Sequence, residues 1–117
     1  MKEILSRLCR MPGVSGVLMV SADGLLIASE SGLGGKAAEE TASAMVGNLC
    51  RSVSAALEKL GRGQLKNVCV SGAGGRVMVA RAGGAYLAAI LDGEVNLGML
   101  QLEVGAAANE AARNISL

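Results

Sequence analysis

The residues whose types and spacing could bind a phosphate lie in the segment VSGAGGRV, residues 70–77. A dinucleotide-binding loop has the pattern GxGxxG, and a helix follows it so that the helix N-terminus meets the phosphates. Here Val77 stands where the third glycine should be, and a strand-like run follows instead of a helix. A Walker-type loop needs Gly-Lys-Ser/Thr after the glycines, which is absent. The segment is therefore interpreted as a hairpin turn between two strands.

Other catalytic chemistry lacks its usual residues. The chain has no histidine, so the commonest general base and metal ligand is missing and a conventional serine triad is excluded. Its three cysteines, Cys9, Cys50 and Cys69, are far apart and form no CxxC pair. They are interpreted as reduced apolar residues of the core. We expect no active site, no metal and no cofactor.

Composition restricts the partners that the chain can bind. A length of 117 residues with 51% hydrophobic residues is enough for one domain, residues 1–117. The net charge is +1, no run of Lys or Arg occurs, and Tyr86 is the single aromatic residue. These features argue against nucleic-acid binding. The apolar stretches are too short for a membrane span, and the N-terminus does not resemble a signal peptide, so we expect a cytoplasmic protein.

The spacing of apolar, glycine and proline residues predicts three helices and five strands. The last helix begins after Asn96, a good N-cap, and carries Leu97, Leu100, Val104 and Ile115 near one face. The predicted helices are 2–10, 36–60 and 97–114, and the predicted strands are 14–20, 25–29, 64–71, 76–81 and 85–91.

The two strands 14–20 and 85–91 are apolar on both alternating faces, so they should lie inside the sheet with helices on both sides. Strand 76–81 alternates more, as a less covered strand should. The expected fold class is α/β of the α+β type: a three-layer α-β-α sandwich around a five-stranded, mostly antiparallel sheet.

The helix 36–60 is longer than one small domain needs. Its length is about 37 Å, whereas a five-stranded sheet is only about 20 Å across. An apolar stripe follows steps of three and four, and Gly47 is either a mild weakness or a place of close approach. A second face, with small side chains, is interpreted as a surface for another helix or partner, the alternative being an ordinary solvated face. The stripe consists of Ala42, Met45, Val46, Leu49, Val53, Ala56, Leu57 and Leu60; the second face includes Ser43, Gly47, Arg51, Ser54 and Glu58.

The strand 64–71 should lie at or near an edge of the sheet if 14–20 and 85–91 are central. It is apolar, lacks proline and carries one lysine, and an unprotected edge strand of this kind favours pairing with another chain. We expect a homodimer joined through this strand, with the helices 36–60 side by side. The candidate interface residues are Leu65, Asn67, Val68, Cys69 and Val70.

Nearly the whole chain resembles the Roadblock / dynein light-chain family. The resemblance rests on PGVSGVLMVSADGL, the long Ala-rich helix, LGRGQLKNVCV and DGEVNLGML in this order. It implies the same three-layer fold with strand order 2-1-5-4-3, and a homodimer through the third strand. It also implies no enzymatic site, and the chain resembles bacterial members of the MglB type more than the motor subunits of the family. In such members the paired long helices are implied to contact a small GTPase. By location, the candidate partner-binding residues of this chain are then Ser43, Gly47, Arg51, Ser54 and Glu58.

Three functions are considered. The first, which the family resemblance implies, is a non-catalytic dimer that binds a Ras-like small GTPase and modulates its nucleotide cycle by ordering the switch residues of the GTPase; Arg51 is the one candidate for an arginine finger. The second is an adaptor in a signalling or motor complex, for example with a sensor kinase, without an effect on a GTPase. The third, a ligand-binding sensor or enzyme, needs a polar pocket that no group of residues suggests.

Overall fold

The computed structural model describes residues 1–93 and 95–114. Its elements follow the predicted order of helices and strands. Ile115, which was expected on the last helix, lies outside the described residues. The elements are α1 (Lys2–Cys9), β1 (Val14–Ser21), β2 (Leu26–Ser31), α2 (Lys36–Lys59), β3 (Asn67–Gly72), β4 (Gly75–Ala82), β5 (Ala85–Leu91) and α3 (Leu97–Asn114).

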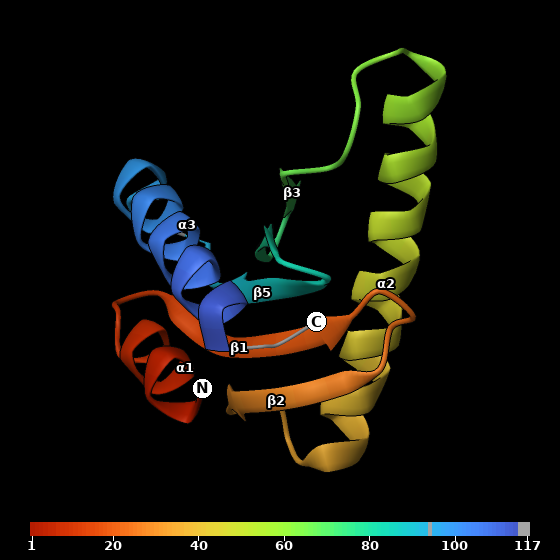
Figure 1. The fold of residues 1–117 in the computed structure, drawn as a ribbon. Helices are drawn as coiled ribbons and strands as arrows, with labels where there is room; N and C mark the ends of the chain where they lie inside the picture. Colours follow the sequence, from red (N-terminus) through yellow and green to blue (C-terminus); the bar gives the residue numbers. More distant parts are fainter. Residues whose placement is uncertain (94, 115–117) are drawn as a thin grey trace.

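The five strands form one sheet in the order β2-β1-β5-β4-β3, and every pair of neighbouring strands is antiparallel. Helices α1 and α3 cover one face of the sheet and α2 covers the other (Figure 1). The predicted fold class and strand order are confirmed. The strands that were apolar on both faces, β1 and β5, are central, because only a central strand has both faces covered.

The segment 70–77 forms the predicted hairpin. Gly72 pairs with Gly75 across a turn of two residues that joins β3 to β4. A Cβ atom on Gly75 would lie 2.4 Å from the carbonyl oxygen of Leu91, so this position has no room for a side chain. The glycines of this segment therefore serve the hairpin and its packing.

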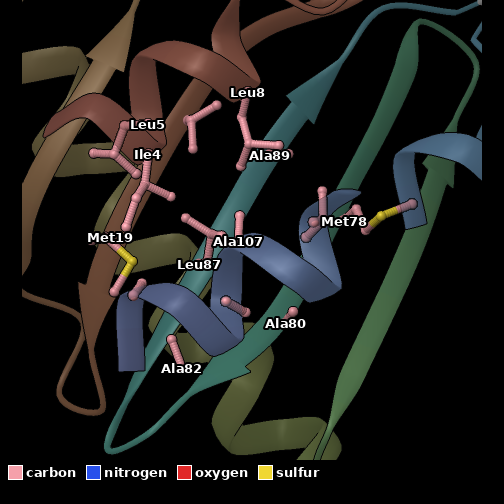
Figure 2. Close-up of a cluster of buried hydrophobic side chains, with 14 of the residues drawn as sticks. Ile4, Leu5, Leu8, Met19, Met78, Ala80, Ala82, Leu87, Ala89 and Ala107 are labelled. Carbon is pink, nitrogen blue, oxygen red and sulfur yellow. The ribbon is translucent and has the colours of Figure 1, made fainter. Parts of the chain in front are cut away.

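The face under α1 and α3 holds one of two hydrophobic clusters (Figure 2). Ile4, Leu5 and Leu8 of α1 point toward the sheet, where Met19 and Leu87 meet them. Beneath α3 the sheet and helix present mainly alanines, which let the helix lie close to the strands. The alanines are Ala80, Ala82, Ala85, Ala89, Ala107, Ala108 and Ala111.

The second cluster lies on the α2 face. Its buried residues include Leu18 of β1, Val79 of β4 and Cys50 of α2. Tyr86 of β5 is half-buried and packs against this cluster. Several other apolar residues of this face are only partly buried, so the α2 layer is less complete than the layer on the opposite face.

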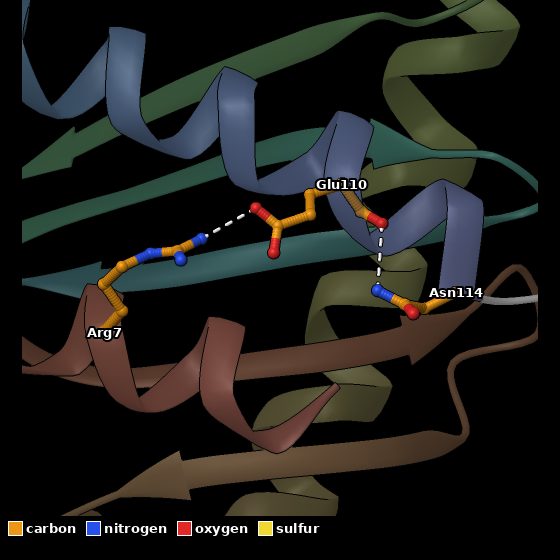
Figure 3. Close-up of polar contacts among 3 residues, drawn as sticks. All are labelled: Arg7, Glu110 and Asn114. Atoms are coloured by element: carbon orange, nitrogen blue, oxygen red, sulfur yellow. Dashed lines mark hydrogen bonds and ion pairs between the residues drawn. The ribbon is translucent and has the colours of Figure 1, made fainter.

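A contact on the surface joins the two helices of the first layer. Arg7 of α1 forms an ion pair with Glu110 of α3 at 2.9 Å, and the carbonyl oxygen of Glu110 accepts a hydrogen bond from the Asn114 amide at 3.2 Å (Figure 3). Because both partners of the ion pair are exposed, it contributes about 0–1 kcal/mol. The stability of this layer therefore comes mainly from the buried cluster.

The predicted bounds of two strands are wrong by more than one residue. The strand predicted at 25–29 is Leu26–Ser31, with an irregular register beside Ile27. The strand predicted at 64–71 begins only at Asn67. Leu65 precedes it with a side chain that is 2% exposed in the α2-side cluster, so it belongs to the core of its own chain rather than to an exposed edge strand.

Candidate protein-binding surface

Helix α2 lies over β1 and β2 and leaves much of its length beyond them (Figure 1). Its buried residues are Ser43, Val46, Gly47 and Cys50, which define the line along which it meets the sheet and the β1–β2 hairpin. This line runs along one margin of the apolar stripe, because three of its four residues are not part of that stripe. The helix is therefore rotated relative to the orientation that the stripe predicted.

The small residues Ser43 and Gly47 explain this rotation. The Ser43 hydroxyl donates a hydrogen bond to the carbonyl oxygen of Gly24 at 3.0 Å, and a Cβ on Gly47 would lie 2.6 Å from the Gly24 Cα. Gly24 has φ +85°, which glycine adopts without strain. The expectation of an exposed position is wrong for both residues: they allow close approach of their own hairpin. Close approach, one of the two interpretations of Gly47, is confirmed.

The other candidate partner-binding residues of α2 are accessible to different degrees. Arg51 is exposed, and its guanidinium donates a hydrogen bond to the Asn48 side-chain oxygen. Ser54 is half-buried and Glu58 is exposed. Of the five predicted residues, Arg51 and Glu58 thus remain fully available to a partner.

The side of α2 opposite Arg51 and Glu58 exposes apolar side chains that belong to the predicted apolar stripe. Met45 is 66% exposed and Leu60 is 70% exposed. Together with half-buried Leu49 and exposed Ala56 they follow one another at steps of four, seven and four, which places them on one side of the helix. We call these four residues the apolar flank. Its members were all part of the predicted stripe, but periodicity alone does not tell which part of a wide stripe meets the sheet.

The α2 face of the sheet also exposes apolar side chains, near β3. Val70 of β3 is 43% exposed, and it pairs across the strands with half-buried Val77, which in turn pairs with half-buried Ile90. These three side chains line a shallow hollow on the α2 face of the sheet. Val68 points to the same face but packs against the cluster of its own chain. The sheet near β3 and the flank of α2 thus both present uncovered apolar surface.

Strand β3 also has an open backbone edge. The Arg81 amide donates to the Lys66 carbonyl oxygen at 2.8 Å, so the backbone groups of residue 66 point toward β4. Because these groups alternate in direction along an antiparallel strand, those of Asn67, Cys69 and Ser71 point away from the sheet. Beyond β3 the sheet has no further strand among the described residues. The side chains of Asn67 and Cys69 line a hollow of about 130 Å³ beside α3. Cys69 is exposed, so its interpretation as a core residue is wrong, whereas Cys50 is buried and Cys9 is half-buried.

Two environments around α2 change the pKa of an ionisable side chain. Hydrogen bonds from the Ser31 hydroxyl and, to a lesser extent, the Ser29 hydroxyl lower the pKa of the Glu39 carboxyl group. Burial raises the pKa of the Cys50 thiol, with a smaller opposing effect from the Arg51 charge. Both effects belong to the packing of α2 and support no catalytic assignment.

The described residues contain neither a group of metal ligands nor a helix that could span a membrane. Within residues 1–93 and 95–114, no group of three His, Cys, Asp or Glu side chains is placed to hold a metal ion. No helix in this part of the chain is long and apolar enough to cross a bilayer. The candidate site is the open edge of β3 together with the exposed apolar surface beside it.

The sequence pattern of the Roadblock/LC7 domain matches residues 1–92. The chain belongs to the Roadblock/LC7 family. Among its relatives, the uncharacterized protein MJ0714 of Methanocaldococcus jannaschii is 30% identical over 108 residues, which cover 92% of this chain and 90% of that protein.

Solved structures share the fold. The Roadblock/LC7 domain from Streptomyces avermitilis superposes with a TM-score of 0.88 at 23% identity, covering 97% of this chain and 96% of that one. The gliding protein MglB from Thermus thermophilus superposes with a TM-score of 0.84 at 22% identity, covering 96% of this chain and 85% of that one. At this level of identity the likeness establishes the architecture alone, and the partner has to be argued from the surface.

Proposed function

We propose that this Roadblock/LC7 domain forms a homodimer through β3 and α2, and that the dimer binds a Ras-like small GTPase and modulates its nucleotide cycle without an active site of its own. The observation that carries the proposal is the open edge of β3 beside uncovered apolar surface on α2 and the sheet. An edge strand of this kind, without proline or inward charge, favours pairing with an identical strand. The membership of the family supports the choice of a GTPase as partner.

A symmetric dimer accounts for both exposed features at once. Pairing of β3 with its copy would satisfy the outward amide and carbonyl groups of Asn67, Cys69 and Ser71. It would also bring the apolar flank of one α2 toward the flank of the other and over the hollow at Val70. Burial of apolar surface contributes about 25 cal/mol per Å², so a side chain as exposed as Met45 or Leu60 adds measurably to association.

The test of the dimer uses the backbone of Cys69. Proline has no amide hydrogen, so Cys69→Pro removes an outward donor while leaving the bonds between β3 and β4 in place. We expect light scattering to give twice the chain mass of 11.7 kDa for the wild type and the single chain mass for Cys69→Pro. Cys69→Ser, which keeps the amide, is the matched control and should stay dimeric. A monomeric wild type would contradict the proposal.

The test of the GTPase partner uses the Ras-like GTPases encoded in the same genome, each loaded with GDP or a non-hydrolysable GTP analogue. We expect calorimetry to detect binding of the dimer to one of them and a change in its GTP hydrolysis rate. An arginine finger increases the rate of GTP hydrolysis by about 10³- to 10⁵-fold. Because the dimer is expected to order the switch residues of the GTPase rather than to donate an arginine finger, Arg51→Ala should lower the stimulated rate by about tenfold or less. Absence of binding in both nucleotide states would refute the GTPase function.

A further inference from the structure

The charges of this nearly neutral chain are divided unevenly along the sequence. Residues 51–81 contain six lysines and arginines and one glutamate, a net charge of +5, whereas the rest of the chain contains five basic and nine acidic residues, a net charge of −4. The chain therefore contains a strongly basic segment although its net charge is only +1. The six basic residues are Arg51, Lys59, Arg62, Lys66, Arg76 and Arg81.

Four of these residues lie along the C-terminal half of α2 and the loop that connects it to β3. The C-terminal half of α2 and the loop after it extend beyond the sheet (Figure 1). Arg51 and Lys59 belong to α2, Arg62 follows the helix, and Lys66 ends the loop, where its carbonyl oxygen accepts a hydrogen bond from the Arg81 amide of β4; all four residues are exposed. We call these four residues the basic tip. Among the described residues only Arg7 and Glu110 form an ion pair, so none of the four basic residues is paired with a carboxylate, although exposed Glu58 lies next to Lys59.

The backbone of the basic tip is held in place at both ends. The Arg62 amide donates to the Leu57 carbonyl oxygen at 2.8 Å, and Gly61 adopts φ +68°, which closes the end of the helix. Next to Lys66, the Leu65 side chain is buried in the cluster under α2. The loop therefore presents Arg62 and Lys66 from a constrained backbone, which reduces the entropy lost on binding.

We propose that the basic tip docks against an acidic surface of the GTPase partner; this inference rests on the proposed function and specifies the chemistry of the partner. Unpaired exposed cations attract a surface of opposite charge and accelerate its association. A protein fits better than a nucleic acid, because the single aromatic residue, Tyr86, is half-buried and no stacking platform accompanies the cations.

The experiment compares two double charge reversals of equal size. Arg62→Glu with Lys66→Glu reverses the basic tip, and Lys2→Glu with Arg10→Glu makes the same change in net charge at exposed positions in and next to α1. For the GTPase that binds the wild type, we expect stopped-flow association to slow about tenfold or more for the first variant at low salt and to change by about twofold or less for the second. Raising NaCl from about 50 to about 500 mM should slow association of the wild type and of the control, and hardly affect the tip variant.

The possible results separate the inference from the function beneath it. If the wild type binds the GTPase and both variants bind it equally well, the basic tip is not the docking surface, while the proposed function stands. If the wild type binds no GTPase, the proposed function and the inference about the basic tip are both overturned. The wild type is also tested for binding to phosphatidylserine vesicles and to a single-stranded oligonucleotide. If either binds more strongly than the GTPase, and the tip variant loses that binding, the basic tip belongs to a membrane or a nucleic-acid site and the inference is overturned.

Discussion

Two glycines decide how α2 lies on this molecule. Gly47 of the helix and Gly24 of the β1–β2 turn approach so closely that a single methyl group on Gly47 has no space. Ser43, one turn earlier, is fully buried and donates to the Gly24 carbonyl oxygen. From the sequence these small residues could equally mark a surface for a partner. Only the structure shows that the hairpin of the same chain occupies it.

We expect Gly47→Ala to destabilise the fold although alanine favours helices more than glycine. The Cβ would lie 2.6 Å from the Gly24 Cα, a backbone atom that cannot move aside alone. Overpacking of this kind costs about 1–3 kcal/mol. The control is Gly105→Ala in α3, where a Cβ meets nothing within 4 Å and should stabilise by about 0.5–1 kcal/mol. Urea unfolding of the two variants should show opposite signs, and a stabilised Gly47→Ala would contradict this account.

Glu39 gives the α2 layer a dependence on pH. Hydrogen bonds, first from Ser31 and then from Ser29, lower the pKa of its carboxyl group in the folded state. A lowered folded pKa means that Glu39 stabilises the fold above its unfolded pKa, about 4.3, and that this stabilisation is lost as the pH falls through the folded pKa. We expect Glu39→Gln to lower the melting temperature at pH 7 and to have a smaller effect below about pH 4. Glu40→Gln, at the exposed neighbouring position, is the control for a general charge effect.

At the scale of elements, the sequence predicts which segments form helices and strands better than it predicts what each one faces. Turn residues such as Asp23-Gly24 and Gly83-Gly84 interrupt the apolar runs clearly, so the number and order of elements could be predicted. The apolar flank of α2 could not be separated from the core, because Met45 and Val46 continue one stripe. Their exposure differs only through the rotation that Gly47 permits.

The start of β3 shows the same limit. Leu65 continues the apolar pattern of the strand, yet it is buried before the strand begins. We expect Leu65→Ala to destabilise the fold by about 2–5 kcal/mol, as a buried truncation does. Leu25→Ala makes the same change at a side chain that is 68% exposed and should cost about 0.5 kcal/mol or less. Equal costs in thermal or urea unfolding would show that Leu65 is not a core residue.

At the scale of the whole molecule, the basic segment 51–81 includes the strand through which the proposed dimer forms. Two copies joined at β3 would therefore bring two segments of net charge +5 toward each other. Repulsion between them opposes association and is screened by salt. In the proposed dimer, apolar burial and strand pairing must therefore outweigh the repulsion between the two basic segments. Binding of an acidic partner would reduce this repulsion.

This balance makes the salt dependence of the dimer informative. We expect its dissociation constant to fall about three- to tenfold when NaCl rises from about 50 to about 500 mM. The variant with Arg62→Glu and Lys66→Glu should lose most of this dependence. Analytical ultracentrifugation of both proteins measures it directly, and a wild-type dimer that weakens in salt would indicate attraction rather than repulsion across the interface.

The position of Tyr86 gives this protein a built-in optical reporter. It is the single aromatic side chain of the chain, and it packs half-buried on the α2 face, away from the layer formed by α1 and α3. Its fluorescence therefore senses one layer of the sandwich, whereas circular dichroism averages over all helices. Comparing the two signals during unfolding would reveal whether the α2 layer separates from the sheet before the rest of the domain loses its structure.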